Sequence, residues 1–304
     1  MRDKVILSRI YRYWTWKHVG WTDVKVEFVI IKCYDKKVNY KRGTMELTIQ
    51  EKIEKVRDLR PIDDVFFEVL AKNMSVCQEM LRTILEDNSL VVTDVVTQSD
   101  ERNIYGRSVR LDALCILGNG TKCNIEVQRS DNDNHLKRVR FNASSITVRD
   151  SNQGTKFDDV LELYIVYISE FDIFKENKTI YHVEKILRET GTYIDDGLHE
   201  IFVNTCIDDG TDIAALMSCL KQKEIKHPKF PVLSSEVARL KETEGGVQVV
   251  CEIMQKYENI AIKKERVEIL QKMIKEKYTK ESILRLGFTE DEYAEAESGL
   301  AQLV

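Results

Sequence analysis

The sequence predicts an α/β protein in which helices pack on a mixed β-sheet, and three observations lead to that prediction. Up to about residue 85 the apolar residues recur at helical spacing. Residues 90–128 then alternate with a period of two, which is typical of strands. Residues 159–169 form a β-branched and aromatic run typical of a strand buried on both faces, and a helical pattern returns after about residue 211. This order favours a mixed sheet flanked by helices.

The composition is that of an ordinary globular protein. The chain has 304 residues, of which 43% are hydrophobic and 32% charged, so it can bury a large core. Its net charge of −5 argues against a passive coat on DNA but not against a metal site, which is itself acidic. No apolar run reaches about 18 residues, so no membrane segment is expected. Seven cysteines without a C-x-x-C pair fit a reducing cytoplasm and make a zinc site unexpected.

Three regions are expected. Residues 1–44 hold all three tryptophans and 11 of the 46 basic residues, against only four acids. They are either a basic, aromatic arm or a translated upstream stretch that is not native to the domain, and we favour the second interpretation. Residues 45–230 are expected to form the main α/β domain, and residues 231–304 a helical C-terminal region.

The first elements are predicted to be helices. Residues 48–58 have the pattern of a short polar helix. Asp64 is expected to cap a helix at residues 65–71, because it closes a Pro-Ile-Asp-Asp start signal. The segment Ser75–Gln78 has a capping-box pattern that would open the next helix, which runs to about Leu85.

Strands and further helices follow. Residues 90–98, 108–117 and 122–128 are predicted as strands, with Gly118–Gly120 joining the last two as a hairpin. The remaining elements are expected to be a helix at 135–148, strands at 159–169, 179–188 and 198–204, and helices at 212–221, 233–243, 247–285 and 290–301, with a break at Gly245–Gly246.

The hairpin decides whether two carboxylates meet. Because side chains alternate along a strand, a three-residue loop that pairs Leu117 with Thr121 places Asp112 across from Glu126. Their Cβ atoms would then lie about 5 Å apart. A two-residue loop would put the two acids on opposite faces. We therefore predict an odd-numbered loop, or a bulge with the same effect.

Two carboxylates at this separation repel each other unless a proton or a cation lies between them. Hard oxygen ligands select Mg²⁺, for which Mn²⁺ can substitute, and the carbonyl of Val127 could supply a third ligand. Such an ion activates water and stabilises charge on a phosphodiester. In the alternative interpretation, Asp112 and Glu126 are ordinary polar residues on the wet face of an exposed hairpin. Apolar neighbours such as Leu114 and Ile125 favour the buried site, where unpaired carboxylates are costly.

A basic zone surrounds these acids. Residues 102–149 hold nine Lys and Arg against four acids, which suits contact with phosphates, although each cation could instead be a solvated surface charge. Arg138 and Arg140 are the expected contacts to DNA phosphates. His135 is expected to be a helix cap or a surface residue. The acidic helix at 290–301 argues against DNA contact there and favours a structural or dimerising role.

Several segments in order resemble the PD-(D/E)XK nuclease family transposases, which include recombination-promoting nucleases. The resemblance covers roughly residues 60–255. The segments that carry it are RPIDDVFFEVL at 60–70, CQEMLRTIL at 77–85, GRSVRLDALCIL at 106–117, NIEVQ at 124–128, KRVRFNASSIT at 137–147, VYISEFDIF at 166–174 and GLHEIFVNT at 197–205.

The resemblance implies a restriction-endonuclease-like core and Mg²⁺-dependent cleavage of DNA, with an origin in mobile elements. By position, Asp112 matches the metal-binding aspartate, Glu126 the second acid and Gln128 the third motif residue. An acid on the first core helix would be Glu79, with Glu68 as the runner-up.

Two departures from the family pattern concern the motif itself. Leu111 replaces the proline before Asp112, which does not affect metal binding. Gln128 replaces a lysine, and an amide cannot take up a proton at neutral pH, so Gln128 is expected to orient water or phosphate. The alternative function is a catalytically inactive relative that binds DNA or a protein. A homodimer is left open, because cutting both strands of DNA usually needs two active sites.

Overall fold

The computed structural model describes residues 48–101, 109–151, 154 and 156–301, and it groups the chain into two compact units. One unit is Thr48–Glu258, and the described part of the other is 259–301. Residues 1–44 lie outside the described residues, so their interpretation as an atypical extension stays a prediction.

A six-stranded mixed sheet forms the centre of the Thr48–Glu258 unit, with the strand order β1-β2-β3-β4-β8-β5. Its first three strands pair antiparallel, β3, β4 and β8 pair parallel, and β5 returns antiparallel to β8. The bounds are β1 (Val92–Glu101), β2 (Val109–Leu117), β3 (Lys122–Gln128), β4 (Leu163–Ser169), β5 (Ile180–Val183) and β8 (Leu198–Asn204). The predicted mixed α/β sheet is confirmed.

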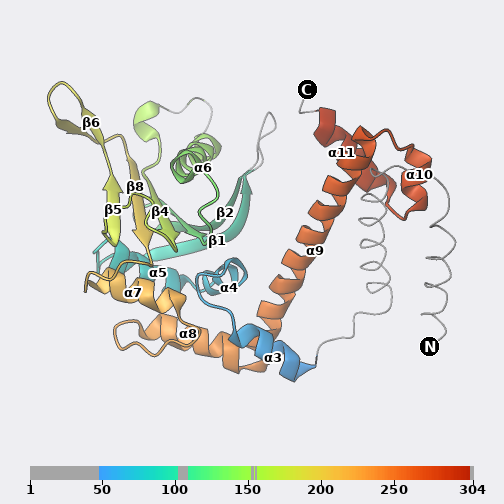
Figure 1. The fold of residues 1–304 in the computed structure, drawn as a ribbon. Coiled ribbons are helices and arrows are strands. Elements are labelled where there is room, and N and C mark those ends of the chain that lie inside the picture. The colour runs from blue at the N-terminus through green and yellow to red at the C-terminus, as the bar shows by residue number, and fades with distance from the viewer. Residues whose placement is uncertain (1–47, 102–108, 152–153, 155, 302–304) are drawn as a thin grey trace. The chain divides into compact units, whose positions relative to one another are not determined.

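Helices cover both faces of this sheet. Helix α6 lies on one face, and α4, α5, α7 and α8 lie on the other (Figure 1). The helices of this unit are α3 (Ile49–Arg57), α4 (Asp64–Leu70), α5 (Met74–Ile84), α6 (His135–Asp150), α7 (Asp212–Lys221), α8 (Pro231–Glu242) and the first part of α9 (Glu244–Lys275). This arrangement is consistent with the restriction-endonuclease-like core that the resemblance implies.

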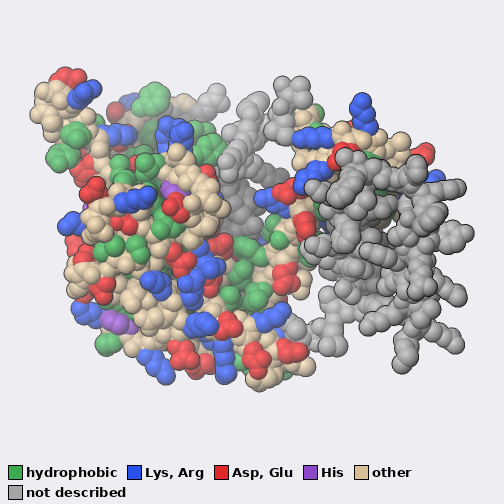
Figure 2. Space-filling model, in the orientation of Figure 1, with side chains coloured by type: hydrophobic (Ala, Val, Ile, Leu, Met, Phe, Trp, Pro, Cys, Tyr) green, Lys and Arg blue, Asp and Glu red, His purple; other side chains and the backbone are tan. Residues whose placement is uncertain are grey.

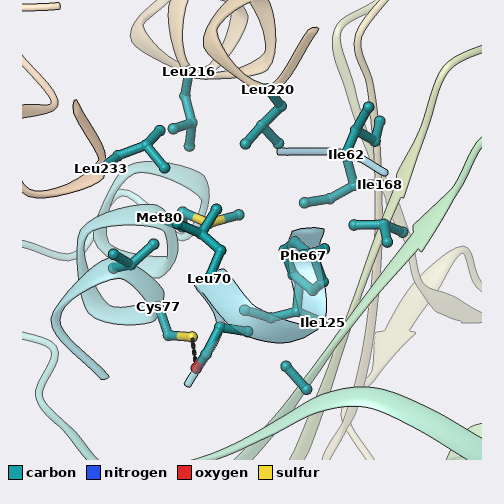
Figure 3. Packing of buried hydrophobic residues seen from close by; sticks show 14 of the residues in the cluster. Ile62, Phe67, Leu70, Cys77, Met80, Ile125, Ile168, Leu216, Leu220 and Leu233 are labelled. Atoms are coloured by element: carbon teal, nitrogen blue, oxygen red, sulfur yellow. Dashed lines mark hydrogen bonds between the residues drawn. The ribbon is translucent and has the colours of Figure 1, made fainter. Parts of the chain in front are cut away.

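The larger apolar core lies between the sheet and the four helices. Ile125 and Ile168 project from the strands toward Phe67 of α4 and Leu220 of α7 (Figure 3). These side chains are at most 1% exposed, and burial of apolar surface at this density is the main stabilising contribution to the fold. A smaller cluster under α6 includes Leu114, Val139, Ile146, Ile165 and Phe202.

The starts of α4 and α5 differ from the prediction. Asp63, not Asp64, is the N-cap residue of α4, and its carboxylate accepts a hydrogen bond from the backbone N–H of Arg60 instead of capping the helix. The predicted capping box at the start of α5 is wrong, because Asn73 caps that helix. The amide oxygen of Gln78 accepts a hydrogen bond from Val92 instead, so tertiary contact overrides the local pattern.

Two predicted strands change in extent. The run at 159–169 begins as a strand only at Leu163, after a 3₁₀ turn at Phe157–Asp159. The segment at 179–188 divides into β5 and β6 (Lys185–Leu187), and β6 pairs with the unpredicted β7 (Thr192–Ile194) in a separate two-stranded sheet.

The C-terminal helices also differ from the prediction. The break between α8 and α9 lies at Thr243, and the predicted break residues Gly245 and Gly246 belong to the first turn of α9. At Gly246 a Cβ would lie 2.3 Å from the carbonyl oxygen of Arg239 and 2.7 Å from the Cα of Leu240, so glycine permits the close approach of α8 and α9. Helix α9 ends at Lys275, and a separate helix α10 (Lys280–Arg285) follows.

The 259–301 part contains the end of α9, α10 and α11 (Glu290–Ala301) around a small core of its own. Leu270, Met273 and Ile283 are buried there. The guanidinium of Arg266 pairs with Glu292 and lies 4.6 Å from the centre of the Phe288 ring. Within the described part of the chain, no helix combines the length and apolar content needed to cross a membrane.

Candidate active site

The β2–β3 hairpin has the register that the sequence predicts. Leu117 donates its backbone N–H to the carbonyl of Thr121 at 2.9 Å, which closes a three-residue loop. Ala113 then pairs with Ile125, and one further step along the two strands sets Asp112 opposite Glu126. The prediction of an odd-numbered loop is confirmed.

Glu126 is a buried carboxylate on the sheet face that α6 covers. Its side chain is 5% exposed. Its Oε1 accepts hydrogen bonds from the amide of Asn124 at 2.9 Å and from the amide of Asn142 at 3.1 Å. Asn124 lies two residues back on the same strand, and Asn142 comes from α6. Strand alternation and helix packing together fix this carboxylate in one orientation.

Asp112 is half-buried, and its Oδ2 accepts a hydrogen bond from the backbone N–H of Val127 at 3.0 Å. The pKa of Glu126 is raised well above its ordinary value, first because it is buried and then because the charge of Asp112 lies nearby. The hydrogen bond from Asn124, the charge of Arg138 and the backbone N–H of Asp112 act in the opposite direction. The carboxylate pair therefore favours a proton or a cation between its members.

The donor set fits a hard divalent cation. The carboxylates of Asp112 and Glu126 supply oxygen ligands, and the buried amide oxygen of Asn124 has no hydrogen-bond partner. Among the described residues, no group of three or more His, Cys, Asp and Glu side chains converges as a ready metal cage. Mg²⁺ is commonly bound by only one or two carboxylates together with water and substrate phosphates, so two acids suffice for it.

Gln128 and Arg138 form the outer part of the site. The Nη1 atom of Arg138 donates to Oε1 of Gln128 at 2.8 Å, and Nε2 of Gln128 donates to the carbonyl of Ser130 at 2.8 Å. Both ends of the Gln128 amide are thus engaged, and the amide holds the guanidinium next to the buried pair. Arg138 therefore brings a cation from α6 to the position where the family pattern has a lysine.

His135 is buried, so the expectation of a cap or surface residue is wrong. It is 6% exposed, and both ring nitrogens have partners: Nδ1 lies 2.9 Å from the Tyr167 hydroxyl and Nε2 lies 3.0 Å from Oδ1 of Asp131. Its ring also packs against Phe171, with 4.8 Å between centroids. The sequence carried only a weak signal for this residue, because the partner hydroxyl lies on a distant strand.

The structure does not bring Glu79 to the site. Its two carboxylate oxygens accept hydrogen bonds from the backbone N–H groups of Val232 and Leu233, so it caps α8 on the opposite face of the sheet. The runner-up, Glu68, is 3% exposed and pairs with Lys256 at 3.3 Å, while its Oε2 has no hydrogen-bond partner.

Asp64, at the start of α4, interacts electrostatically with Arg138 of the candidate site. The residue as a whole is exposed, but crowding around its carboxyl raises its pKa, and the charges of Arg129 and Arg138 oppose that rise. The start of α4 is held at this end of the sheet because Arg129 pairs with Asp63 at 3.0 Å. Asp64 was predicted only as a helix cap.

The basic zone is partly neutralised. Arg102 and Arg107 lie outside the described residues, and the side chain of Arg110 is not described. Lys122 and Arg149 both pair with Asp150. Arg140 is exposed on α6. Over the described residues on the face drawn in Figure 2, Lys and Arg side chains are interspersed with Asp and Glu. Arg138 is therefore distinguished by its position beside the carboxylates and not by membership of a large cationic patch.

One hollow in the described residues lies away from the candidate site. A cavity of about 770 Å³ lies near the hairpin turn at Gly118 and extends to His199. That turn precedes β3, whereas Gln128 ends it, so the cavity is at the other end of the strand from the Arg138 contact. The carboxylate pair, and not the size of a hollow, identifies the site because metal binding depends on ligand chemistry.

Comparison with known families is consistent with this geometry. Residues 62–206 match the family described as PD-(D/E)XK nuclease family transposase, which confirms the resemblance over β1 to β8. Neither the curated proteins nor the solved structures contain a match to the chain.

Proposed function

We propose, on the premise that residues 62–206 belong to the PD-(D/E)XK nuclease family transposases, that the chain is a metal-dependent DNA endonuclease associated with transposition or recombination. The observation that carries this proposal is the hairpin register, which sets Asp112 opposite the buried Glu126. Nucleases of this family generally use divalent metal ions, and the oxygen donors here suit Mg²⁺, with Mn²⁺ as a substitute.

Each residue then has a separate role. Asp112 and Glu126 would hold the ion, which lowers the pKa of water and stabilises charge on a phosphodiester. Asn124 and Asn142 orient the Glu126 carboxylate. Arg138 would contact the scissile phosphate, and Gln128 holds its guanidinium in place through the 2.8 Å hydrogen bond. Arg140 would contact a phosphate farther along the DNA, where it positions the strand without touching the reacting group.

Nicking of supercoiled plasmid DNA tests the proposal. We expect cleavage in Mg²⁺ or Mn²⁺ and none in a chelator. The variants Asp112→Asn and Glu126→Gln should each lose at least about 100-fold in rate, because each removes one charged ligand. A matched control is Glu200→Gln, which neutralises another carboxylate of the same sheet whose pKa is raised by burial.

The controls separate the two candidate functions. Loss of cutting in both ligand variants, with cutting retained in Glu200→Gln, supports a nuclease. A wild-type protein that cuts in neither metal, while DNA retention survives Asp112→Asn, would instead identify a catalytically inactive DNA-binding relative.

A further inference from the structure

We propose that Arg129 is a further contact to the DNA backbone, held ready for a phosphate by a ring of ion pairs. The other members of this ion-pair ring are Arg60, Asp63 and Glu170. The inference rests on the proposed nuclease function and adds a phosphate-binding residue to it. Arg129 directly follows β3, the strand that carries Glu126.

The ring is closed because each of its two acids bridges both arginines. Oδ1 of Asp63 lies 2.9 Å from Nη2 of Arg60 and 3.0 Å from Nη1 of Arg129. The Glu170 carboxylate lies 2.6 Å from Nη1 of Arg60 and 3.5 Å from Nε of Arg129. Cations and anions therefore alternate around the ring, and their charges balance. A guanidinium bridged in this way is oriented before any ligand arrives.

Backbone contacts bring the ring together from distant parts of the chain. The backbone N–H of Glu170 donates to the carbonyl of Gln128 at 3.0 Å, so the end of β4 lies beside the end of β3. Oδ2 of Asp63, the N-cap residue of α4, accepts from the backbone N–H of Arg60 at 2.7 Å. The ring thus joins the start of α4 to the ends of two strands, which gives Arg129 a fixed base.

Two arginines then reach the end of β3 from different sides. Consecutive residues of an extended chain project to opposite faces. Gln128 is directed toward α6 and holds Arg138 there, whereas Arg129 pairs at the start of α4, a helix of the other face. Val127, whose N–H donates to Asp112, lies only two residues before Arg129. A DNA strand passing over the end of β3 would meet one guanidinium at the scissile phosphate and the other at a neighbouring phosphate.

Arg129 is the outermost member of the ring. Its side chain is 48% exposed, whereas that of Asp63 is 11% exposed, so an approaching strand meets the cation before the acid beneath it. The ring uses the Nη1 and Nε atoms of Arg129. Within the described part of the chain, its Nη2 atom has no partner. That N–H group is directed by the ring and remains able to donate to a phosphate oxygen.

Fluorescence anisotropy with a DNA duplex in Ca²⁺ at several salt concentrations tests the contact. Arg129→Ala should weaken binding about 5-fold and lower the slope of log K against log salt concentration by about one. The matched control is Arg239→Ala, because Arg239 is 53% exposed and is also ion-paired, with Glu236 of its own helix. The control should change binding by less than about 2-fold and leave the slope unchanged.

An unchanged slope in Arg129→Ala would overturn the proposal, because a residue that only stabilises the ring does not alter the number of phosphate contacts. Melting temperatures measured in parallel show whether the variant is folded. Arg129→Gln keeps a donor for the ring and should show the same loss of slope if Arg129→Ala is unstable.

Arg129→Lys tests whether the ring matters. A lysine keeps the charge but cannot bridge both acids with a planar fork. We expect the slope to stay at the wild-type value while binding weakens about 3-fold. Wild-type affinity in Arg129→Lys would overturn the role of the ring, because a loosely held charge would then serve equally well.

The binding assay also separates this contact from cleavage. A loss of one unit of slope in Arg129→Ala, in a protein that never cuts DNA in Mg²⁺ or Mn²⁺, would leave the contact standing and overturn the nuclease function. Cleavage that depends on Asp112, with no change of slope in Arg129→Ala, would leave the nuclease function standing and overturn the contact.

Discussion

The central sheet separates two buried charges that are stabilised in different ways. Among the helices on one face, the Lys241 ammonium is 4% exposed and donates to three backbone carbonyls, those of Arg57, Leu59 and Lys223. Under α6 on the other face, the Glu126 carboxylate is equally buried but lies against a second carboxylate, Asp112. Burial lowers the pKa of Lys241 to about 8 and raises that of Glu126.

The difference between them distinguishes a charge with a structural role from one that, in the proposed function, binds a cation. The three hydrogens of the Lys241 ammonium match three carbonyl acceptors, so this buried charge is fully hydrogen-bonded. The carboxylate pair, in contrast, repels itself, and only a bound cation or proton relieves the repulsion. Perturbed groups of that second kind gather at functional sites, where activity and not stability selects them.

The largest expected effect is on the structural side of this comparison. Lys241→Met preserves the length of the side chain but removes the donor for three carbonyls. We expect the free energy of unfolding to fall by about 3 kcal/mol, measured by urea denaturation. The exposed Lys226→Met is the control and should change it by less than about 0.5 kcal/mol. Equal effects in the two variants would show that the buried ammonium has no special structural role.

Removing the functional charge should have a smaller effect of the opposite sign. Because folding raises the pKa of Glu126 above 4.5, the folded protein holds that proton more tightly than the unfolded chain. The resulting stability is complete below pH 4.5 and is lost as the pH rises through the folded pKa. At pH 8 without metal, we expect Glu126→Gln to be more stable than the wild type by about 1 kcal/mol.

Calorimetry at two pH values with and without metal checks this effect. Between pH 5 and pH 8 the wild type should lose about 2–4 °C of melting temperature relative to Glu126→Gln. Mn²⁺ should restore the loss at pH 8 in the wild type but not in the variant. Parallel melting curves in all four conditions would mean that the acids share neither a proton nor a cation.

The smallest expected effect concerns the exposed cation of α6. Arg140→Ala should weaken DNA binding about 2–3-fold. It should also lower the slope of log K against log salt concentration by about one, which corresponds to one lost phosphate contact. Fluorescence anisotropy in Ca²⁺ at several salt concentrations measures both quantities. A loss from Arg140→Ala as large as that from Arg138→Ala would show that general phosphate attraction, and not placement beside the acids, determines binding.

Local patterns were sufficient to predict the part of the site that lies on one hairpin. The alternation along 108–117 and 122–128, with the Gly118–Gly120 loop between them, determines the register of two neighbouring strands. Because side chains repeat with a period of two, that register decides whether Asp112 and Glu126 share a face. The same reasoning predicted the mixed α/β fold from the change of period along the chain.

Tertiary structure alone decided which distant residues complete the site. Tyr167 reaches Glu126 through a parallel pairing, and no short turn fixes the register of parallel strands. The contacts of Asn142 with Glu126 and of His135 with Tyr167 depend on which side of α6 meets the sheet. Glu79 is an acid on a helix where the resemblance implies a catalytic acid, yet α8 packs against it and its carboxylate caps that helix. Neighbours along a hairpin are encoded in local spacing, whereas contacts across crossovers follow from the packing of the whole core.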